Sequence, residues 1–101
     1  MNEITSFDEV SKSKAAVVLD CWAPWCMPCK MLLPVFEQVA KELDGKAKFL
    51  KCNIDEQQEI ANQLVIRSIP TLIVFRNGEE KNRFSGSMSA NQLKEWITGS
   101  L

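Results

Sequence analysis

The sequence contains no histidine among its 101 residues. Histidine is the commonest general base in enzymes and a frequent zinc ligand. Its absence excludes histidine-based catalysis and every zinc site that needs a histidine. The four cysteines are therefore the first candidates for chemistry, as a redox pair, as metal ligands or as small buried apolar residues.

The sequence also lacks long apolar runs and an excess of charge of one sign. No stretch approaches the roughly 20 apolar residues that cross a bilayer, so we expect no membrane association. Lysine and arginine number 12 against 13 aspartates and glutamates, and this balance argues against a nucleic-acid partner. The chain opens Met1-Asn2-Glu3 without the basic and apolar segments of a signal peptide. This opening favours a cytoplasmic location.

The length and composition are those of one folded domain. Hydrophobic residues make up 46% of the chain, enough for a core without disulfide staples. There is no repeat, low-complexity tract or linker, so we expect a single domain over residues 1–101.

Apolar patterns alternate between the strand and helix periods. They predict strands at 3–5, 15–22, 47–54, 71–75 and 80–85, with helices at 6–13, from Pro24 to Gly45, after Asp55 and after Ser89. Strands separated by helices pair in parallel, and Asn77-Gly78 predicts a closing antiparallel hairpin. The expected fold is α/β, a mixed sheet of four or five strands with helices on both faces.

Local signals refine these elements. Pro34 is expected to kink the long helix, whose buried face should include Met31. Three pairs fit a capping box at a helix start: Ser6 with Glu9, Asp55 with Gln58, and Ser89 with Gln92.

Cys26 and Cys29 stand where a buried strand meets the long helix. Two cysteines three residues apart on a first helical turn satisfy the Cα separation of a disulfide, about 4.4–6.8 Å. Pro28 is tolerated there because the first amides of a helix lack intrahelical partners. The helix dipole favours the thiolate of Cys26, and Cys29 lies deeper and less exposed. A C-x-x-C in a βαβ setting predicts a redox pair.

Metal binding is the alternative from a different class. Cys21, Cys26 and Cys29 have the C-x4-C-x2-C spacing of plant-type ferredoxins, with Cys52 further on. The same four residues are the only cysteine ligands for zinc. The iron–sulfur alternative requires Cys21 on a cluster-binding loop, whereas its neighbours predict a strand. We expect Cys21 and Cys52 to lie side by side on adjacent strands, where both are buried and reduced and pack as small apolar residues. The alternative is that they form a second redox pair.

The segment at 20–31, DCWAPWCMPCKM, closely resembles the active-site signature of the thioredoxin family. Further similarities follow in order along nearly the whole chain: Pro34, the segment at 51–55, Ile69-Pro70-Thr71, Asn77-Gly78 and Gly86. Two positions depart from the family pattern, because Met27 replaces the usual glycine after the first cysteine and Cys21 a commonly aromatic residue. Met27 is expected to alter the redox potential and partner choice.

The resemblance implies a thioredoxin fold and roles for individual residues. Cys26 would be the nucleophile and Cys29 the resolving thiol. Asp20 would be a buried acid, with a raised pKa, that exchanges a proton with Cys29, and Lys51 would lie near it. From the pattern alone, a solvent-facing strand end is the favoured interpretation of Asp20, and Lys51 is equally an ordinary surface lysine.

The resemblance also implies a surface for substrate proteins, with Pro70 in the cis form and Trp22 supporting the site from beneath. Its members would be Trp25, Met27, Pro28, Ile69, Pro70 and Gly86. From the pattern alone, Trp22 and Trp25 could each be an ordinary core residue with no role in substrate binding.

The implied activity is reduction of protein disulfides by a monomer that a separate reductase, such as thioredoxin reductase, recycles. No glycine-rich phosphate loop is present, so we expect no cofactor on this chain. A glutaredoxin-like or an oxidase/isomerase role is the alternative within redox chemistry. The missing histidine between the cysteines counts against an isomerase.

Overall fold

The structure, a computed structural model, describes residues 2–101. Its elements follow the predicted order βαβαβαββα. They are β1 (Asn2–Glu3), α1 (Asp8–Ser11), β2 (Val17–Trp22), α2 (Met27–Glu42), β3 (Lys48–Asn53), α3 (Gln58–Gln63), β4 (Thr71–Arg76), β5 (Glu79–Ser85) and α4 (Ala90–Ser100).

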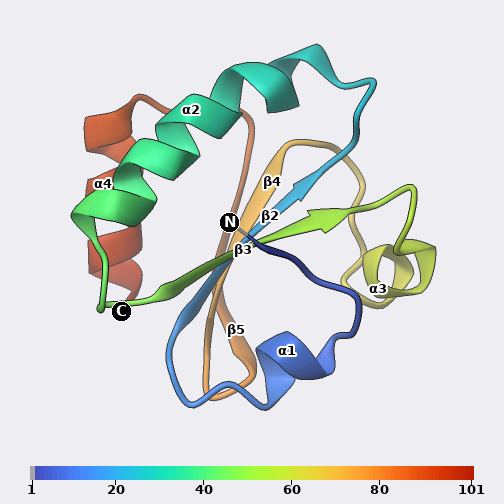
Figure 1. Cartoon of the computed structure of the whole chain (residues 1–101), viewed down its shortest axis with the longest axis horizontal. Coiled ribbons are helices and arrows are strands. Elements are labelled where there is room, and N and C mark those ends of the chain that lie inside the picture. The colour runs from blue at the N-terminus through green and yellow to red at the C-terminus, as the bar shows by residue number, and fades with distance from the viewer. Residues whose placement is uncertain (1) are drawn as a thin grey trace.

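The five strands form one mixed sheet in the order β1-β3-β2-β4-β5. Strands β1, β3 and β2 are parallel, whereas β4 and β5 are antiparallel to their neighbours. Helices α2 and α4 cover one face of the sheet, and α1 and α3 cover the other (Figure 1). The predicted fold class is therefore confirmed, with five strands.

Side-chain alternation along β2 decides which residues reach the redox helix. Val17, Leu19 and Cys21 enter the apolar cluster under α1 and α3. Val18 packs in the cluster under α2 and α4. Because successive side chains of a strand point to opposite faces, Asp20 lies on the α2 side. This places a carboxylic acid beneath the start of the helix that carries both Cys26 and Cys29.

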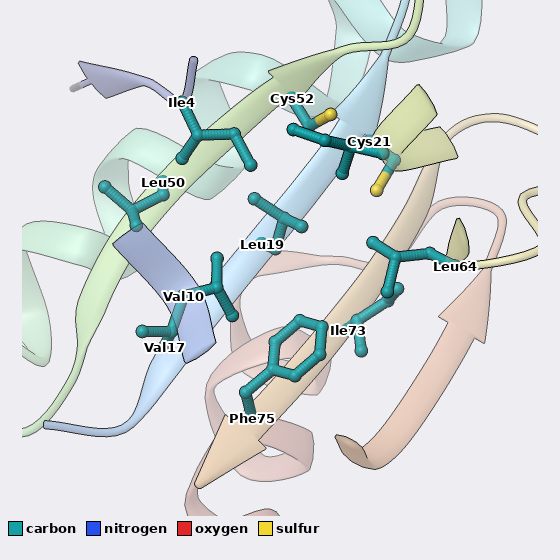
Figure 2. Packing of buried hydrophobic residues seen from close by; sticks show 11 residues of the cluster. Ile4, Val10, Val17, Leu19, Cys21, Leu50, Cys52, Leu64, Ile73 and Phe75 are labelled. Carbon is teal, nitrogen blue, oxygen red and sulfur yellow. The ribbon is translucent and has the colours of Figure 1, made fainter. Parts of the chain in front are cut away.

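Cys21 and Cys52 are register partners on the adjacent parallel strands β2 and β3. Figure 2 shows both side chains inside the cluster under α1 and α3. Both thiols are free, and the residues are 0% and 1% exposed. The Cys52 side chain and burial raise the pKa of the Cys21 thiol, so it stays protonated. The prediction of buried, reduced cysteines is confirmed.

The predicted caps had mixed outcomes. Ser89 and Gln92 form the complete capping box of α4. Ser6 and Glu9 form only half of theirs: the Glu9 carboxylate accepts from the Ser6 amide at 3.2 Å, but the Ser6 hydroxyl accepts from Asp8. Helix α1 therefore begins at Asp8, later than predicted.

The predicted cap of α3 is wrong. The N-cap position of α3 is Gln57, and the Asp55 carboxylate accepts a hydrogen bond from the Trp25 indole instead. Asp55 thus belongs to the surroundings of the cysteines. At the other end of the sheet, Asn77 and Gly78 form the predicted hairpin turn, with φ of 53° and 77°.

Val65 ends α3 in a strained conformation, with φ of +55°. The Val65 amide donates to Asn62 and the Ile66 amide to Ala61. These two bonds define a Schellman motif, in which the position of Val65 is normally glycine. A β-branched residue is a genuine outlier at this φ, and Val65 is 55% exposed, so its side chain contributes little packing in return.

We expect Val65→Gly to raise the free energy of unfolding by about 1 kcal/mol, because relief of the left-handed strain exceeds the added entropy of the unfolded chain. Chemical denaturation measures the change. The control Gln63→Gly, two residues earlier at the last position of α3, should lower stability by up to about 1 kcal/mol. Destabilisation by Val65→Gly would contradict this interpretation of the helix end.

Candidate active site

Cys26 and Cys29 form a disulfide at the N-terminus of α2, with their Cα atoms 5.3 Å apart. Cys26 is the N-cap residue, in extended conformation with ψ of 107°, and Pro28 lies in the first turn. The Cys29 amide donates to the Cys26 sulfur at 3.2 Å. The helix start therefore directs an N–H group at Cys26, where it stabilises a thiolate when the disulfide is reduced.

The two cysteines differ less in exposure than predicted. Cys26 is 5% exposed and Cys29 is 3% exposed, so Cys26 is not an open surface thiol in the disulfide form. Ala23 and the partly buried Ile54 and Ile69 pack around the pair. The sulfurs are distinguished by their neighbours, since the Cys26 sulfur accepts a hydrogen bond from the helix amide and Cys29 lines a small, partly open cavity.

This cavity has a volume of about 30 Å³. A cavity of roughly 10–15 Å³ holds one water molecule, so there is room for water between Cys29 and Asp20. The lining residues come from β2, α2 and β3, and they are Asp20, Trp22, Cys29, Lys30, Leu33 and Lys51.

Asp20 is 1% exposed, so it is not the solvent-facing strand end that the pattern alone allowed. Its Oδ1 atom has no hydrogen-bond partner among residues 2–101. Burial raises the pKa of Asp20 to about 7; Lys51 acts in the opposite direction and Glu3 in the same direction. A carboxyl group that titrates near neutral pH beside Cys29 is suited to accept a proton there.

Lys51 is the register partner of Asp20 across β2 and β3, and its side chain is only 14% exposed. Its carboxylate partner is nevertheless Glu3, with Nζ 3.5 Å from the Glu3 Oε2 atom. The Lys51 ammonium also lies 4.2 Å from the centroid of the Trp22 ring. The structure thus adds Glu3 to the site. The sequence did not predict this, because β1 is only two residues long and its pattern does not indicate how it pairs with β3.

The rim of the site exposes large apolar side chains. Trp25 is 68% exposed and its indole donates to Asp55 at 2.9 Å. Met27 is 63% exposed, and Met31, one turn further along α2, is 70% exposed. The predicted burial of Met31 is wrong, because the buried stripe of α2 runs through Leu32 instead.

The Ile69–Pro70 loop closes the other side of the site. The peptide bond between these residues is cis, and Pro70 is buried whereas Ile69 is partly exposed. Gly86 donates its amide to the Pro70 carbonyl at 3.0 Å. The loop therefore ties β5 to the cysteines, because Ile69 packs against their cluster.

The statistical model of the family described as Thioredoxin matches residues 2–99. The chain belongs to the thioredoxin family. Thioredoxin from Rickettsia bellii is 48% identical over 94 residues, which cover 93% of this chain and 90% of that protein. Thioredoxin from Rickettsia typhi is 42% identical over 101 residues, which cover 100% and 96%.

A solved structure agrees with this assignment. The thioredoxin of Malassezia sympodialis, described as a member of a pan-allergen family, superimposes with a TM-score of 0.89 at 37% sequence identity. The match covers 100% of this chain and 91% of that one. With its cysteine pair in place, this thioredoxin family member is a protein thiol–disulfide oxidoreductase.

The arrangement of the cysteines disfavours the metal-site alternative. Cys21 lies within β2 rather than on a loop, and Cys21 and Cys52 belong to a different cluster from Cys26 and Cys29. Residues 2–101 contain no group of three or more cysteine, aspartate or glutamate side chains placed to hold a metal ion. An iron–sulfur or zinc site would need the cysteines to converge.

Within the same residues, no helix is both long and apolar enough to span a membrane.

Proposed function

We propose that this thioredoxin family member is a dithiol reductase of protein disulfides. The observation that carries the proposal is the asymmetric environment of its disulfide: Cys26 accepts the amide at the helix start, whereas Cys29 faces the cavity that contains Asp20. One sulfur is thereby suited to attack and the other to resolution. Residues 1–101 would act as one domain, as a monomer.

The cycle starts from the reduced pair. The Cys26 thiolate attacks one sulfur of a substrate disulfide, the substrate S–S bond breaks, and the other substrate sulfur leaves as a thiolate that takes a proton from water. Cys26 is then joined to the substrate by a mixed disulfide. The amide of Cys29, 3.2 Å from the Cys26 sulfur, stabilises the attacking thiolate.

Resolution uses the buried side of the site. The Cys29 thiol transfers its proton to the Asp20 carboxylate, directly or through water in the 30 Å³ cavity. The Cys29 thiolate attacks the Cys26 sulfur and breaks the mixed disulfide, so the substrate sulfur leaves as a thiolate that takes a proton from water, and the Cys26–Cys29 disulfide forms. Two electrons have passed to the substrate, and a separate reductase must return them.

The exposed rim supplies the substrate surface in this proposal. Trp25, Met27 and Pro28 are exposed on one side of the disulfide, and the other side consists of the partly exposed Ile69 and Gly86 together with the buried Pro70. A hollow of about 870 Å³ lies beside the C-terminal end of α2 and includes none of these residues. An open apolar rim, rather than a deep pocket at the cysteines, suits protein substrates.

The remaining partners follow from this chemistry. A protein that must be returned to the dithiol form needs a reductase, and thioredoxin reductase is the expected one. The buried free thiols of Cys21 and Cys52 fit a reducing compartment such as the cytoplasm. No cofactor on this chain and no nucleic acid or membrane partner are required.

Insulin reduction tests the proposal and its main alternative. With NADPH and thioredoxin reductase, this protein should accelerate insulin precipitation at least about tenfold over its rate with glutathione and glutathione reductase. Each reductase system without the protein serves as the control. The opposite preference would establish a glutaredoxin-like function, and inactivity in both systems would contradict the reductase proposal.

A further inference from the structure

Glu3, the last residue of β1, makes three polar contacts next to the redox site. Its Oε2 atom accepts a hydrogen bond from the Trp22 indole at 2.7 Å and lies 3.5 Å from the Lys51 ammonium. Its Oε1 atom accepts a hydrogen bond from the backbone amide of Asn53 at 2.9 Å. Each carboxylate oxygen therefore has a partner on a strand that borders the site.

Two of these partners line the cavity between Asp20 and Cys29, since Trp22 and Lys51 are both among its lining residues. The Lys51 ammonium lies over the Trp22 ring, so one carboxylate fixes both members of a stacked pair. Glu3 itself is not a lining residue of the cavity. Glu3 therefore contacts the cavity only through the two side chains that it holds, although its charge also acts on Asp20.

The third contact extends to the rim. The backbone amide of Asn53 donates to Glu3. The side-chain oxygen of Asn53 accepts a hydrogen bond from the backbone amide of Asp55 at 3.0 Å. The Asp55 carboxylate accepts from the exposed Trp25 indole. A continuous series of hydrogen bonds thus links Glu3 to the tryptophan beside Cys26.

We propose that Glu3 is a positioning residue of the redox site, which holds Lys51 and Trp22 against the cavity and thereby controls proton transfer between Cys29 and Asp20. The proposal rests on the function proposed above, and it adds a residue that lies outside the C-x-x-C helix and touches neither sulfur. Glu3 forms an ion pair with Lys51. Without Glu3, the Lys51 ammonium would interact with the Asp20 carboxylate alone.

The charges around Asp20 determine the direction of the effect. Its register partner on β4 is the neutral Leu72, and the ionisable groups that face it from the other elements are Glu3 on β1, Lys51 on β3, and Cys29 and Lys30 on α2. Lys51 lowers the pKa of Asp20 and Glu3 raises it. Removing the charge of Glu3 eliminates a repulsion and frees Lys51, and both changes favour the Asp20 carboxylate.

Glu3→Gln tests the proposal because it removes the charge and keeps the side-chain length. In the oxidised protein, the ¹³C NMR titration of the Asp20 carboxyl group should move to lower pH by about 0.5 pH unit, the order expected for removal of one charge that is largely screened by solvent. The control Glu95→Gln removes an exposed charge on α4 and should leave the midpoint unchanged. A Glu3→Gln midpoint equal to that of the wild type, or higher, overturns the proposal.

A kinetic measurement separates this proposal from the function on which it rests. The pH profile of mixed-disulfide resolution should shift in Glu3→Gln by the same amount as the titration, and the shift should vanish in an Asp20→Asn background. A shifted NMR titration with an unshifted rate profile would overturn the role of Asp20 in resolution and uphold the effect of Glu3. Thermal unfolding of each variant establishes that the measurements are made on folded protein.

Discussion

Cys26→Ser should abolish insulin reduction, lowering the rate to the uncatalysed background, a loss of about three orders of magnitude or more. The reason is chemical, because a serine hydroxyl neither ionises at neutral pH nor forms a disulfide. The fold should be unaffected, since Cys26 supplies only an N-cap and one bond of a short crosslink. The rate of insulin precipitation with thioredoxin reductase measures the loss.

The matched control is Cys21→Ala, which also removes one cysteine. Cys21 lies in the cluster under α1 and α3, away from the disulfide, so this variant should reduce insulin at the wild-type rate. Substantial activity in Cys26→Ser would refute the assignment of the nucleophile. Loss of activity in folded Cys21→Ala would show that the second pair of cysteines takes part.

Asp20→Asn should slow resolution of the mixed disulfide at pH 7 by roughly tenfold or more, the lower range for loss of a general base. The initial attack by Cys26 should change much less, because the Asp20 cavity is lined by Cys29 and not by Cys26. Stopped-flow measurement of both steps against pH checks this split. In the wild type the resolution rate should rise through the Asp20 pKa of about 7, and the variant should lack this rise.

The same variant should be more stable than the wild type at neutral and alkaline pH. The pKa of Asp20 is about 7 in the folded protein against an ordinary value of 3.8. Between these values the folded protein binds more protons than the unfolded chain, so wild-type stability falls as the pH rises through this window. Above pH 7 the full cost of the buried charge applies, on the order of 4 kcal/mol.

Asp20→Asn removes this cost, and its stability advantage should disappear below about pH 4, where Asp20 is protonated in both states. Denaturant unfolding at pH 4, 6 and 8 follows the difference. A variant that is less stable than the wild type at pH 8 and resolves at an unchanged rate would make Asp20 a purely structural residue.

Much of the fold was predictable because its signals are local. The nearly continuous apolar run at 15–22 and the turn Asn77-Gly78 each specify an element without knowledge of the rest of the chain. The family resemblance implied that Lys51 lies near Asp20, and the β2–β3 register pairs these two residues and hence Cys21 with Cys52. These pairings follow from side-chain alternation once the two strands are neighbours.

The errors arose where a long-range contact outcompeted a local one. Asp55 has the spacing of a helix cap but bonds to Trp25, 30 residues away in sequence. Met31 fits the apolar period of α2 but lies beyond the edge of its buried stripe. Glu3 gave no signal at all, because its partners Trp22, Lys51 and Asn53 are assembled only when β1 pairs with β3.

Trapping of the reaction intermediate tests the central claim, that Cys26 attacks and Cys29 resolves. Cys29→Ser, incubated in reduced form with a disulfide-containing protein, should accumulate a covalent adduct that dithiothreitol releases. Peptide mass spectrometry should locate the substrate cysteine on Cys26 and on neither Cys21 nor Cys52, which are buried. An adduct on any other cysteine, or reduction of the substrate without an adduct, would contradict the account.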